Sequence, residues 1–176
     1  MDDSNLAELR RLINQRQKTI FEAIKAGIVA ELPHESQLEA QAMQEHMHLK
    51  HVHNAIEFAD LREGVQYEIT VAGEPVNPLA HVAAHAAVKG QIEQDPLVRA
   101  AFEKMTATGT SAHHAEHVLS AILLETYWDG SKAAESGENI DKAQRVYKRK
   151  LQKLIRDWDF RKKLTRQFTA DHSAFE

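Results

Sequence analysis

The stretch "NPLAHVAAHAAVKGQIEQD", residues 77–95, decides the fold class that the sequence predicts. Asn77 is a favoured N-cap residue, and Pro78 suits the first position of a helix, where its missing N–H has no intrahelical partner. The stretch then runs without a break until Pro96, which marks the start of a further, shorter helix. We therefore predict a helix through this stretch and look for the same pattern on both sides of it.

Apolar residues recur at steps of three and four in the neighbouring segments, which is the period of an amphipathic helix. The helices predicted in this way cover residues 5–29, 35–63, 96–105, 113–128 and 140–168. Tyr67, Ile69 and Val71 instead alternate with polar residues, so we expect a short extended or hairpin arm near residues 66–73. Residues 129–139 are polar and are expected to form a linker.

These elements predict an all-α fold, a helical bundle of about four core helices with peripheral N- and C-terminal helices. A chain of 176 residues is long enough for one domain with a real core, and two domains are not expected at this length. We therefore predict a single helical domain over residues 1–176, with its core at residues 35–130.

The composition narrows the class of protein. A formal charge of −4 gives no whole-protein signature of a nucleic-acid or membrane-surface binder, and no apolar run is long enough to cross a bilayer. The absence of cysteine excludes disulfides, thiolate metal ligands and cysteine nucleophiles. It also fits a reducing compartment, and the N-terminus has no apolar signal segment, so we expect a cytoplasmic protein. Eleven histidines make imidazole the chemistry to follow.

Four histidines form two pairs at i, i+4 spacing, which places both rings of a pair on one helix face. His81 and His85 lie among alanines that leave room for another helix or an ion, and His113 and His117 repeat the spacing. Two such helices that face each other can direct four imidazoles toward one metal ion. His114 with His117 is an alternative pair. Nitrogen and oxygen ligands without sulfur suit Zn, Fe, Mn or Ni, so the expected cofactor is a transition metal ion of unknown identity.

Two carboxylates accompany the second pair. Glu125 lies eight residues beyond His117, and the residues between them are nearly all apolar, so we expect Glu125 to be buried and to be a further metal ligand. Glu116 can act as an outer partner, a ligand or a general base, and it is the candidate catalytic residue. Its HxxEH pattern differs from the HExxH of zinc proteases, so we do not interpret it as a protease motif.

A third cluster lies in "EHMHLKHVH" and contains Glu45, His46, His48, His51 and His53. Glu45 and His48 form the ExxH arrangement that di-iron carboxylate bundles use, and Glu45 falls on an apolar stripe. The rings are spread around the predicted helix, so at most one or two of them can point inward. A polar helix face is the favoured interpretation for each.

Two blocks of the sequence, residues 77–95 and "HHAEHVLSAILLETYW" at residues 113–128, together resemble the bacterial family named domain of unknown function 1841. The positions that carry the resemblance are Asn77, Pro78, His81, His85, Gln91, Asp95, His113, His117, Glu125 and Trp128, with Gly73 ahead of them. The resemblance covers about residues 48–150. It implies a helical metal-binding protein and supplies no reaction, because the family is itself uncharacterised.

The resemblance also has departures. Lys89 and Gly90 stand where the family tends to carry acidic residues, and Leu49 stands where its upstream motif has a histidine. The final histidine of that motif corresponds to His53, which is therefore a weaker candidate ligand. A looser similarity, to DinB-like and hemerythrin-like metal-binding bundles, rests only on histidine-rich helices in a bundle.

The C-terminal segment is strongly basic, with eleven Lys and Arg in residues 142–166. Its aromatic residues could stack on nucleotide bases, which is the nucleic-acid interpretation. Its apolar stripe instead favours a helix packed on the rest of the chain. The stripe consists of Val146, Leu151, Leu154, Ile155 and Trp158, and the aromatic residues are Tyr147, Trp158 and Phe160.

We therefore predict a metal-binding helical bundle of unknown reaction whose partners are a metal ion, a small molecule or a second copy of the chain, and not a membrane. If the protein is an enzyme, it is a metal-dependent hydrolase or oxidoreductase in which Glu116 or Glu125 transfers protons to or from a metal-activated water or O2. Two alternatives stay open. One is a non-enzymatic interaction or pH-responsive protein with structural histidines, and the other is a nucleic-acid accessory protein that uses the basic C-terminal helix.

Overall fold

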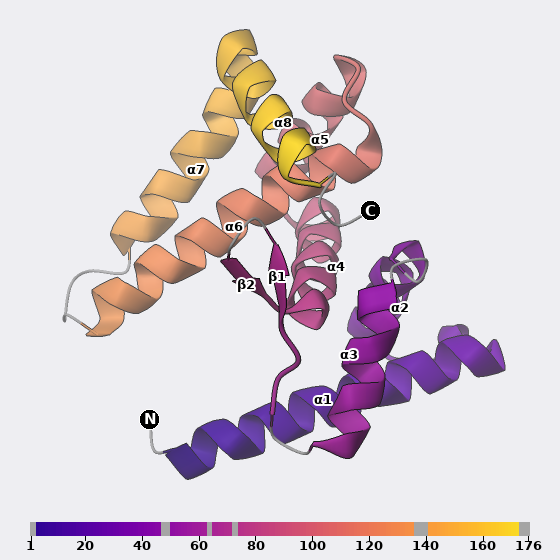
Figure 1. Ribbon diagram of the computed structural model, residues 1–176. Coiled ribbons are helices and arrows are strands. Elements are labelled where there is room, and N and C mark those ends of the chain that lie inside the picture. The colour runs from indigo at the N-terminus through magenta and orange to yellow at the C-terminus, as the bar shows by residue number, and fades with distance from the viewer. Residues whose placement is uncertain (1–2, 47–49, 63–64, 72–73, 136–140, 173–176) are drawn as a thin grey trace. The chain divides into compact units, whose positions relative to one another are not determined.

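The chain forms two compact units, residues 1–86 and residues 87–173, in the computed structural model of Figure 1. The structure describes residues 3–46, 50–62, 65–71, 74–135 and 141–172. Each unit has its own hydrophobic core. Helix α4 (Pro78–Gln94) continues through the boundary between them. The single domain predicted over residues 1–176 stays a prediction.

The described residues are almost entirely helical, which confirms the predicted all-α class. The elements in chain order are α1 (Asp3–Ala26), a 3-10 turn η1 (Val29–Glu31), α2 (His34–Glu45), α3 (Lys50–Leu61), β1 (Ile69–Val71), β2 (Glu74–Val76), α4, α5 (Pro96–Ala107), α6 (Ala112–Glu135), α7 (Asp141–Arg156) and α8 (Trp158–His172). Over this part of the chain, no helix combines the length and the apolar composition that a membrane span needs.

Three predicted boundaries were wrong. The segment 35–63 holds two helices, α2 and α3, and residues 47–49 lie outside the described part of the chain. The predicted linker 129–139 begins as helix, because α6 continues to Glu135. Its polar residues Asp129 and Ser131 face solvent, and a polar helix face has the same composition as a linker.

The third difference is a corner inside the basic segment, at Asp157 between α7 and α8. The Asp157 carboxylate accepts a 2.9 Å hydrogen bond from the backbone N–H of Phe160, which makes it the N-cap of α8. The Arg161 guanidinium donates to the carbonyl oxygens of Leu154 and Ile155 in the last turn of α7. The two side chains satisfy both helix ends, so the segment turns here rather than continuing as one helix.

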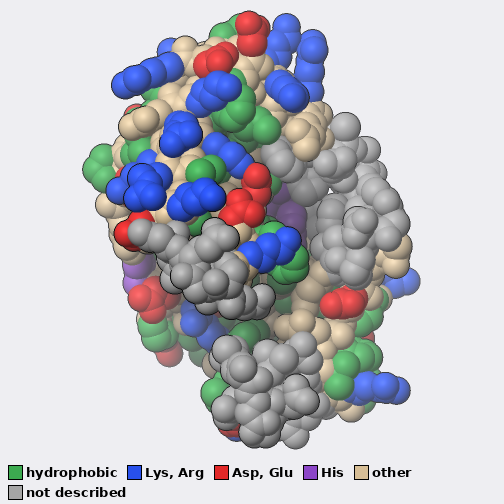
Figure 2. Space-filling view, turned by 90° about the vertical axis from the view of Figure 1, so that its left-hand side faces the viewer, with side chains coloured by type: hydrophobic (Ala, Val, Ile, Leu, Met, Phe, Trp, Pro, Cys, Tyr) green, Lys and Arg blue, Asp and Glu red, His purple; other side chains and the backbone are tan. Residues whose placement is uncertain are grey.

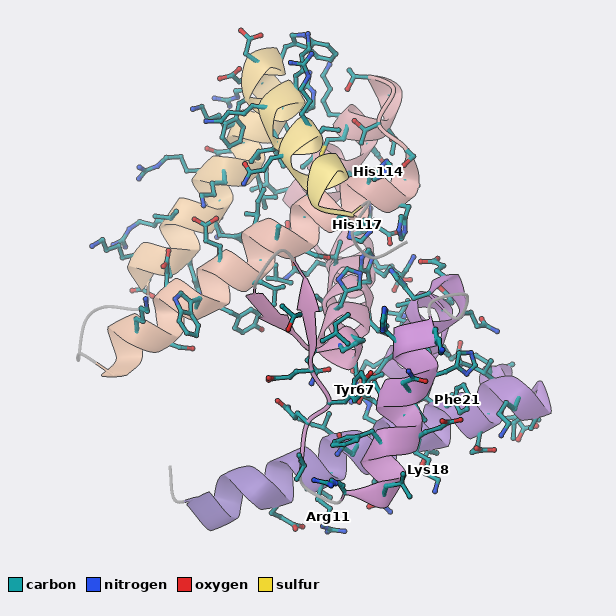
Figure 3. All side chains as sticks on the ribbon, viewed as in Figure 1. Arg11, Lys18, Phe21, Tyr67, His114 and His117 are labelled. Atoms are coloured by element: carbon teal, nitrogen blue, oxygen red, sulfur yellow. The ribbon has the colours of Figure 1, made fainter. Side chains whose placement is uncertain are left out.

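Unit 1 packs α1, α2, α3 and the first turns of α4 around one core. Phe21 and Tyr67, both labelled in Figure 3, pack against it. The apolar stripe predicted over residues 5–29 is only partly buried, since Ile20 is 1% exposed but Ile13 and Ile28 are 40% and 44% exposed. The buried members of this core are Ile20, Ala40, Ala42, Met43, Val52, Ala55, Ile56, Leu79 and Val82.

The predicted arm is a small antiparallel hairpin. Strands β1 and β2 pair with Ile69 opposite Val76 and Thr70 opposite Pro75. Residues 72–73, which include Gly73, lie outside the described residues. The hairpin leads into α4, where the Asn77 side chain accepts hydrogen bonds from the backbone N–H groups of Leu79 and Ala80 at 2.9 and 3.1 Å, as the predicted N-cap requires.

Unit 2 packs the rest of α4 with α5, α6, α7 and α8, and α7 contacts both α5 and α6. The predicted packing of the basic segment is confirmed for Leu151 and Leu154, which are fully buried, but Trp158 is 51% exposed. Figure 2 shows many Lys and Arg side chains on the face that α7 and α8 present. The buried core consists of Val88, Val98, Ala101, Met105, Ala115, Val118, Leu119, Ile122, Leu123, Leu151 and Leu154.

Candidate metal-binding residues

Three histidine rings meet in unit 1. His46 ends α2, and His81 and His85 lie one turn apart on α4. The ring centroid of His46 lies 5.0 Å from that of His81 and 4.7 Å from that of His85. The centroids of the two α4 rings are 4.9 Å apart. Each ring offers a nitrogen within 4.8 Å of a nitrogen of the other two. The predicted pair on α4 is therefore part of a cluster of three imidazoles.

The cluster is enclosed. His46 is 2% exposed, His85 is fully buried, and His81 is half-buried. Ala42, one turn before His46, and Val82, next to His81, are also fully buried and carry no polar side-chain atom. Burying a polar or charged group without a partner is costly, so imidazoles in such surroundings are expected to be hydrogen-bonded or bound to a metal.

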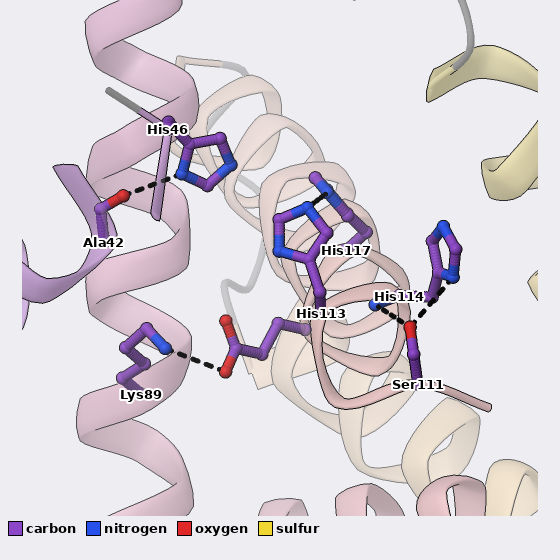
Figure 4. Close-up of polar contacts among 8 residues, drawn as sticks. Ala42, His46, Lys89, Ser111, His113, His114 and His117 are labelled. Carbon is purple, nitrogen blue, oxygen red and sulfur yellow. Dashed lines mark hydrogen bonds and ion pairs between the residues drawn. The ribbon is translucent and has the colours of Figure 1, made fainter. Parts of the chain in front are cut away.

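The orientation of His46 is fixed by a hydrogen bond within its own helix. Its Nδ1 lies 2.7 Å from the carbonyl oxygen of Ala42, as Figure 4 shows. A carbonyl oxygen only accepts, so Nδ1 carries the proton and Nε2 keeps the lone pair that can bind a metal. A backbone carbonyl on the second ring nitrogen is the usual outer partner of a metal-binding histidine.

Sequence reasoning missed His46. As a member of the third cluster, His46 was predicted to lie on a polar helix face. One signal was available, because Glu39, Met43 and His46 follow each other at steps of four and three, and all three are buried. The other members of the cluster do not join it: Glu45 is exposed, His51 and His53 are half-buried outside it, and His48 lies outside the described residues.

In unit 2, His113 and His117 lie side by side on the first turns of α6. Their Nε2 atoms are 2.9 Å apart, and their ring centroids are 4.3 Å apart. Two imidazoles on one tetrahedral metal ion have nitrogens about 3.3 Å apart, from metal–nitrogen distances of about 2.0 to 2.1 Å. The pair therefore needs only a small adjustment to bind one ion through both nitrogens. His117 is 5% exposed, whereas His113 is exposed.

The ring of His114 lies farther from His117 than the ring of His113 does, with centroids 6.5 Å apart against 4.3 Å. Its Nδ1 lies 2.9 Å from the hydroxyl oxygen of Ser111, which also accepts a hydrogen bond from the His114 backbone N–H at 3.2 Å (Figure 4). Ser111 precedes the first residue of α6 and closes its N-terminus. The ring of His114 thus belongs to the cap of the helix.

Glu116 is a buried carboxylate with a cation beside it. Its side chain is 9% exposed, and its Oε1 lies 2.9 Å from the Nζ of Lys89 on α4. A carboxylate oxygen of Glu116 also lies within 4.8 Å of a ring nitrogen of His113. The carboxylate of Glu116 thus lies between the ammonium of Lys89 and the ring of His113, which suits an outer partner of the histidine pair. The catalytic role predicted for it stays a prediction.

Two other predicted ligands lie apart from these clusters. The expected burial of Glu125 was wrong, because its side chain is 56% exposed and pairs with the Nζ of Lys150 at 2.5 Å. The ring of His53 packs edge-on against Phe21 with centroids 5.5 Å apart. Across the described residues, neither belongs to a group of three ligand atoms close enough to hold a metal ion.

The two predicted histidine pairs lie in different units: His81 and His85 in unit 1, His113 and His117 in unit 2. A single site built from both pairs stays a prediction. Among the described residues, each unit by itself brings together histidine nitrogens that could hold a metal ion: His46, His81 and His85 in unit 1, and His113 and His117 in unit 2.

The family described as "Domain of unknown function (DUF1841)" matches residues 32–152. This range contains every candidate ligand discussed above and both sequence blocks that carry the resemblance. It begins further toward the N-terminus than the predicted range of 48–150 and so takes in α2 and His46. No curated protein and no solved structure matches the chain.

Proposed function

We propose that this chain, which belongs to the family described as Domain of unknown function (DUF1841), binds a divalent transition metal ion through His46, His81 and His85. The observation that carries the proposal is the convergence of three ring nitrogens within 4.8 Å of one another, from α2 and α4. The hydrogen bond from His46 to Ala42 supports it, since it leaves the Nε2 lone pair for the ion.

The chemistry of the donors favours a metal of intermediate hardness. With no cysteine in the chain, the ligands are imidazole nitrogens, which suit Zn, Ni and Fe better than Mg or Ca. Three protein ligands leave one position of a tetrahedral ion for water or a substrate, as in catalytic rather than structural zinc sites. A metal bound in this way would polarise a bound water or substrate oxygen, which fits the predicted hydrolase or oxidoreductase class.

The finer form of the proposal adds His113 and His117 as a second pair of nitrogen donors. Their Nε2–Nε2 distance of 2.9 Å supports this role. Titration with Zn²⁺ distinguishes the two ways in which they can contribute. If His113 and His117 bind the same ion as the other three histidines, the double variant His113→Ala, His117→Ala weakens that single site. If they bind a separate ion, the double variant removes one of two equivalents.

The experiment is element analysis of untagged protein before and after reconstitution with Zn²⁺, together with a Zn²⁺ titration. We expect about one equivalent or more in the wild type and one equivalent less in the double variant His81→Ala, His85→Ala. The matched control is His34→Ala, an exposed histidine at the start of α2, which should keep the wild-type content. Circular dichroism checks that each variant is folded. Background metal in reconstituted wild type, with the fold intact, would overturn the proposal and favour structural histidines.

A further inference from the structure

Unit 2 holds a pocket of about 490 Å³ between α6 and α7. None of the proposed metal ligands lines this pocket, and Gln91 of α4 belongs to its lining. The volume falls in the range of about 300 to 1,000 Å³ that is typical of small-molecule sites. A ligand of one or two rings fits such a space.

Small residues line the pocket where the two helices approach each other closely. A Cβ added at Gly130 of α6 would meet the Cβ of Ala143 of α7 at 3.8 Å, so neither helix carries a large side chain at this level. Leu123, which is 5% exposed, contributes an apolar wall from the hydrophobic core. Larger side chains at these two positions would fill the space that a ligand needs.

Two tyrosines supply aromatic walls. Tyr127 is 67% exposed, and Tyr147 is half-buried with its hydroxyl donating to the Oε1 of Gln91. Burial raises the pKa of Tyr147 to about 12, with the charge of Asp95 and the neighbouring Tyr127 adding to the shift. The phenol therefore stays neutral at physiological pH, and its fixed ring can stack on a flat ligand.

The charge on the lining has one sign. Lys148 lies at the pocket, and none of the described residues that line it is a carboxylate. The nearby carboxylate of Glu125 pairs with Lys150 instead. The amide of Gln144 and the hydroxyl of Ser131 add hydrogen-bonding groups to the same lining. A ligand with an apolar ring and one negative charge complements this arrangement.

We propose that the pocket between α6 and α7 binds a small aromatic carboxylate, with the ring against Tyr127 and Tyr147 and the carboxylate at Lys148. This inference is independent of the proposed metal site, because none of the pocket residues is a candidate metal ligand. Binding is therefore expected in metal-loaded and metal-free protein alike.

The test uses 1-naphthoate as the probe and 1-naphthamide as its uncharged counterpart, in calorimetric titrations of the full chain. We expect saturable binding of naphthoate with one site. Lys148→Gln should weaken naphthoate about fivefold and leave naphthamide unchanged, since the pair with the carboxylate is partly exposed to water. The matched control Lys142→Gln changes a cation on the same helix that does not line the pocket, and it should bind as the wild type does.

A second pair of variants tests the pocket itself. Tyr127→Ala removes an exposed wall and should weaken both probes, while Ala143→Leu fills the space and should abolish binding of both. Because Ala143 is 8% exposed, its variant is checked for an intact fold by circular dichroism, and Tyr127→Ala stands alone if that variant does not fold. Absence of saturable binding in the wild type overturns the proposal, and so does equal naphthoate affinity in wild type and Lys148→Gln.

Discussion

The Nζ of Lys89 lies 2.9 Å from the Oε1 of Glu116, and both side chains are largely buried, at 14% and 9% exposure. The family resemblance implies an acidic residue at this position, and Lys89 departs from that expectation. The ion pair gives that departure a physical reason, since a lysine at this point of α4 neutralises a buried carboxylate of α6. Removing the lysine should therefore take a cation away from a largely buried carboxylate.

We predict that Lys89→Met lowers the free energy of unfolding by about 3 kcal/mol, and that the double variant Lys89→Met, Glu116→Gln recovers most of the loss. Urea denaturation measures both. The control is Lys150→Met, whose partner Glu125 is 56% exposed, and it should cost less than about 1 kcal/mol. Equal losses for Lys89→Met and Lys150→Met would contradict the interpretation.

The second prediction concerns the corner between α7 and α8. Asp157→Ala removes the acceptor for the backbone N–H of Phe160 and should lower the free energy of unfolding by about 1 kcal/mol. Thermal unfolding followed by circular dichroism measures the change. Asp159→Ala, an exposed residue in the first turn of the same helix, is the control, and a loss as large as that of Asp157→Ala would show that the cap is not the cause.

The third prediction is a loss of stability at alkaline pH. The pKa of Tyr147 is about 12 in the folded chain against 10 for the ordinary group, so between these values the unfolded chain has lost a proton that the folded chain retains. The contribution of Tyr147 is therefore complete below about pH 10 and is lost as the pH rises toward 12. Tyr147→Phe should show a smaller fall in unfolding free energy between pH 9 and 11 than the wild type.

Tyr67→Phe, in unit 1, is the control for that measurement and should follow the wild-type pH dependence. Ultraviolet absorbance of tyrosinate, followed during an alkaline titration of folded protein, checks the same point directly. One tyrosine that ionises near pH 12 is the expected result. Parallel curves for the wild type and Tyr147→Phe would contradict the assignment.

The fourth prediction follows from the position of His46. His46→Ala removes one of three proposed ligands and should weaken Zn²⁺ binding by at least about tenfold in a competition titration with a chelator. His53→Ala, on α3 and edge-on to Phe21, should bind Zn²⁺ as the wild type does. A loss of affinity in His53→Ala equal to that in His46→Ala would show that the ligand set is different.

Much of the fold could be predicted because the helices are amphipathic and have clear starts. Asn77 caps α4 as its sequence position indicated, and α5 begins at Pro96 as predicted. The pairs His81–His85 and His113–His117 were visible for the same reason, since a spacing of four places two rings together whatever surrounds the helix. Local geometry of this kind depends on a few neighbouring residues and can be read from the sequence.

The errors arose where the sequence gives no direction. Apolar residues occupy every face of α6 before Glu125, so the sequence does not show which face is exposed. In the structure Leu124, Tyr127 and Trp128 are exposed together with Glu125. His46 was missed because one continuous helix over 35–63 spreads the clustered histidines around its axis. No proline or glycine marks the end of α2 at Glu45, where the ring of His46 bonds to Ala42.

The corner at Asp157 has a consequence for the charged surface of unit 2. The carboxylate of Asp157 sits at the positive end of the α8 dipole, and the guanidinium of Arg161 sits at the negative end of the α7 dipole. Two side chains four residues apart thus compensate the helix dipoles at this corner. We therefore expect substitutions of the exposed Lys162 and Lys163 to leave this corner intact, so that the charge of the surface can change while the fold is kept.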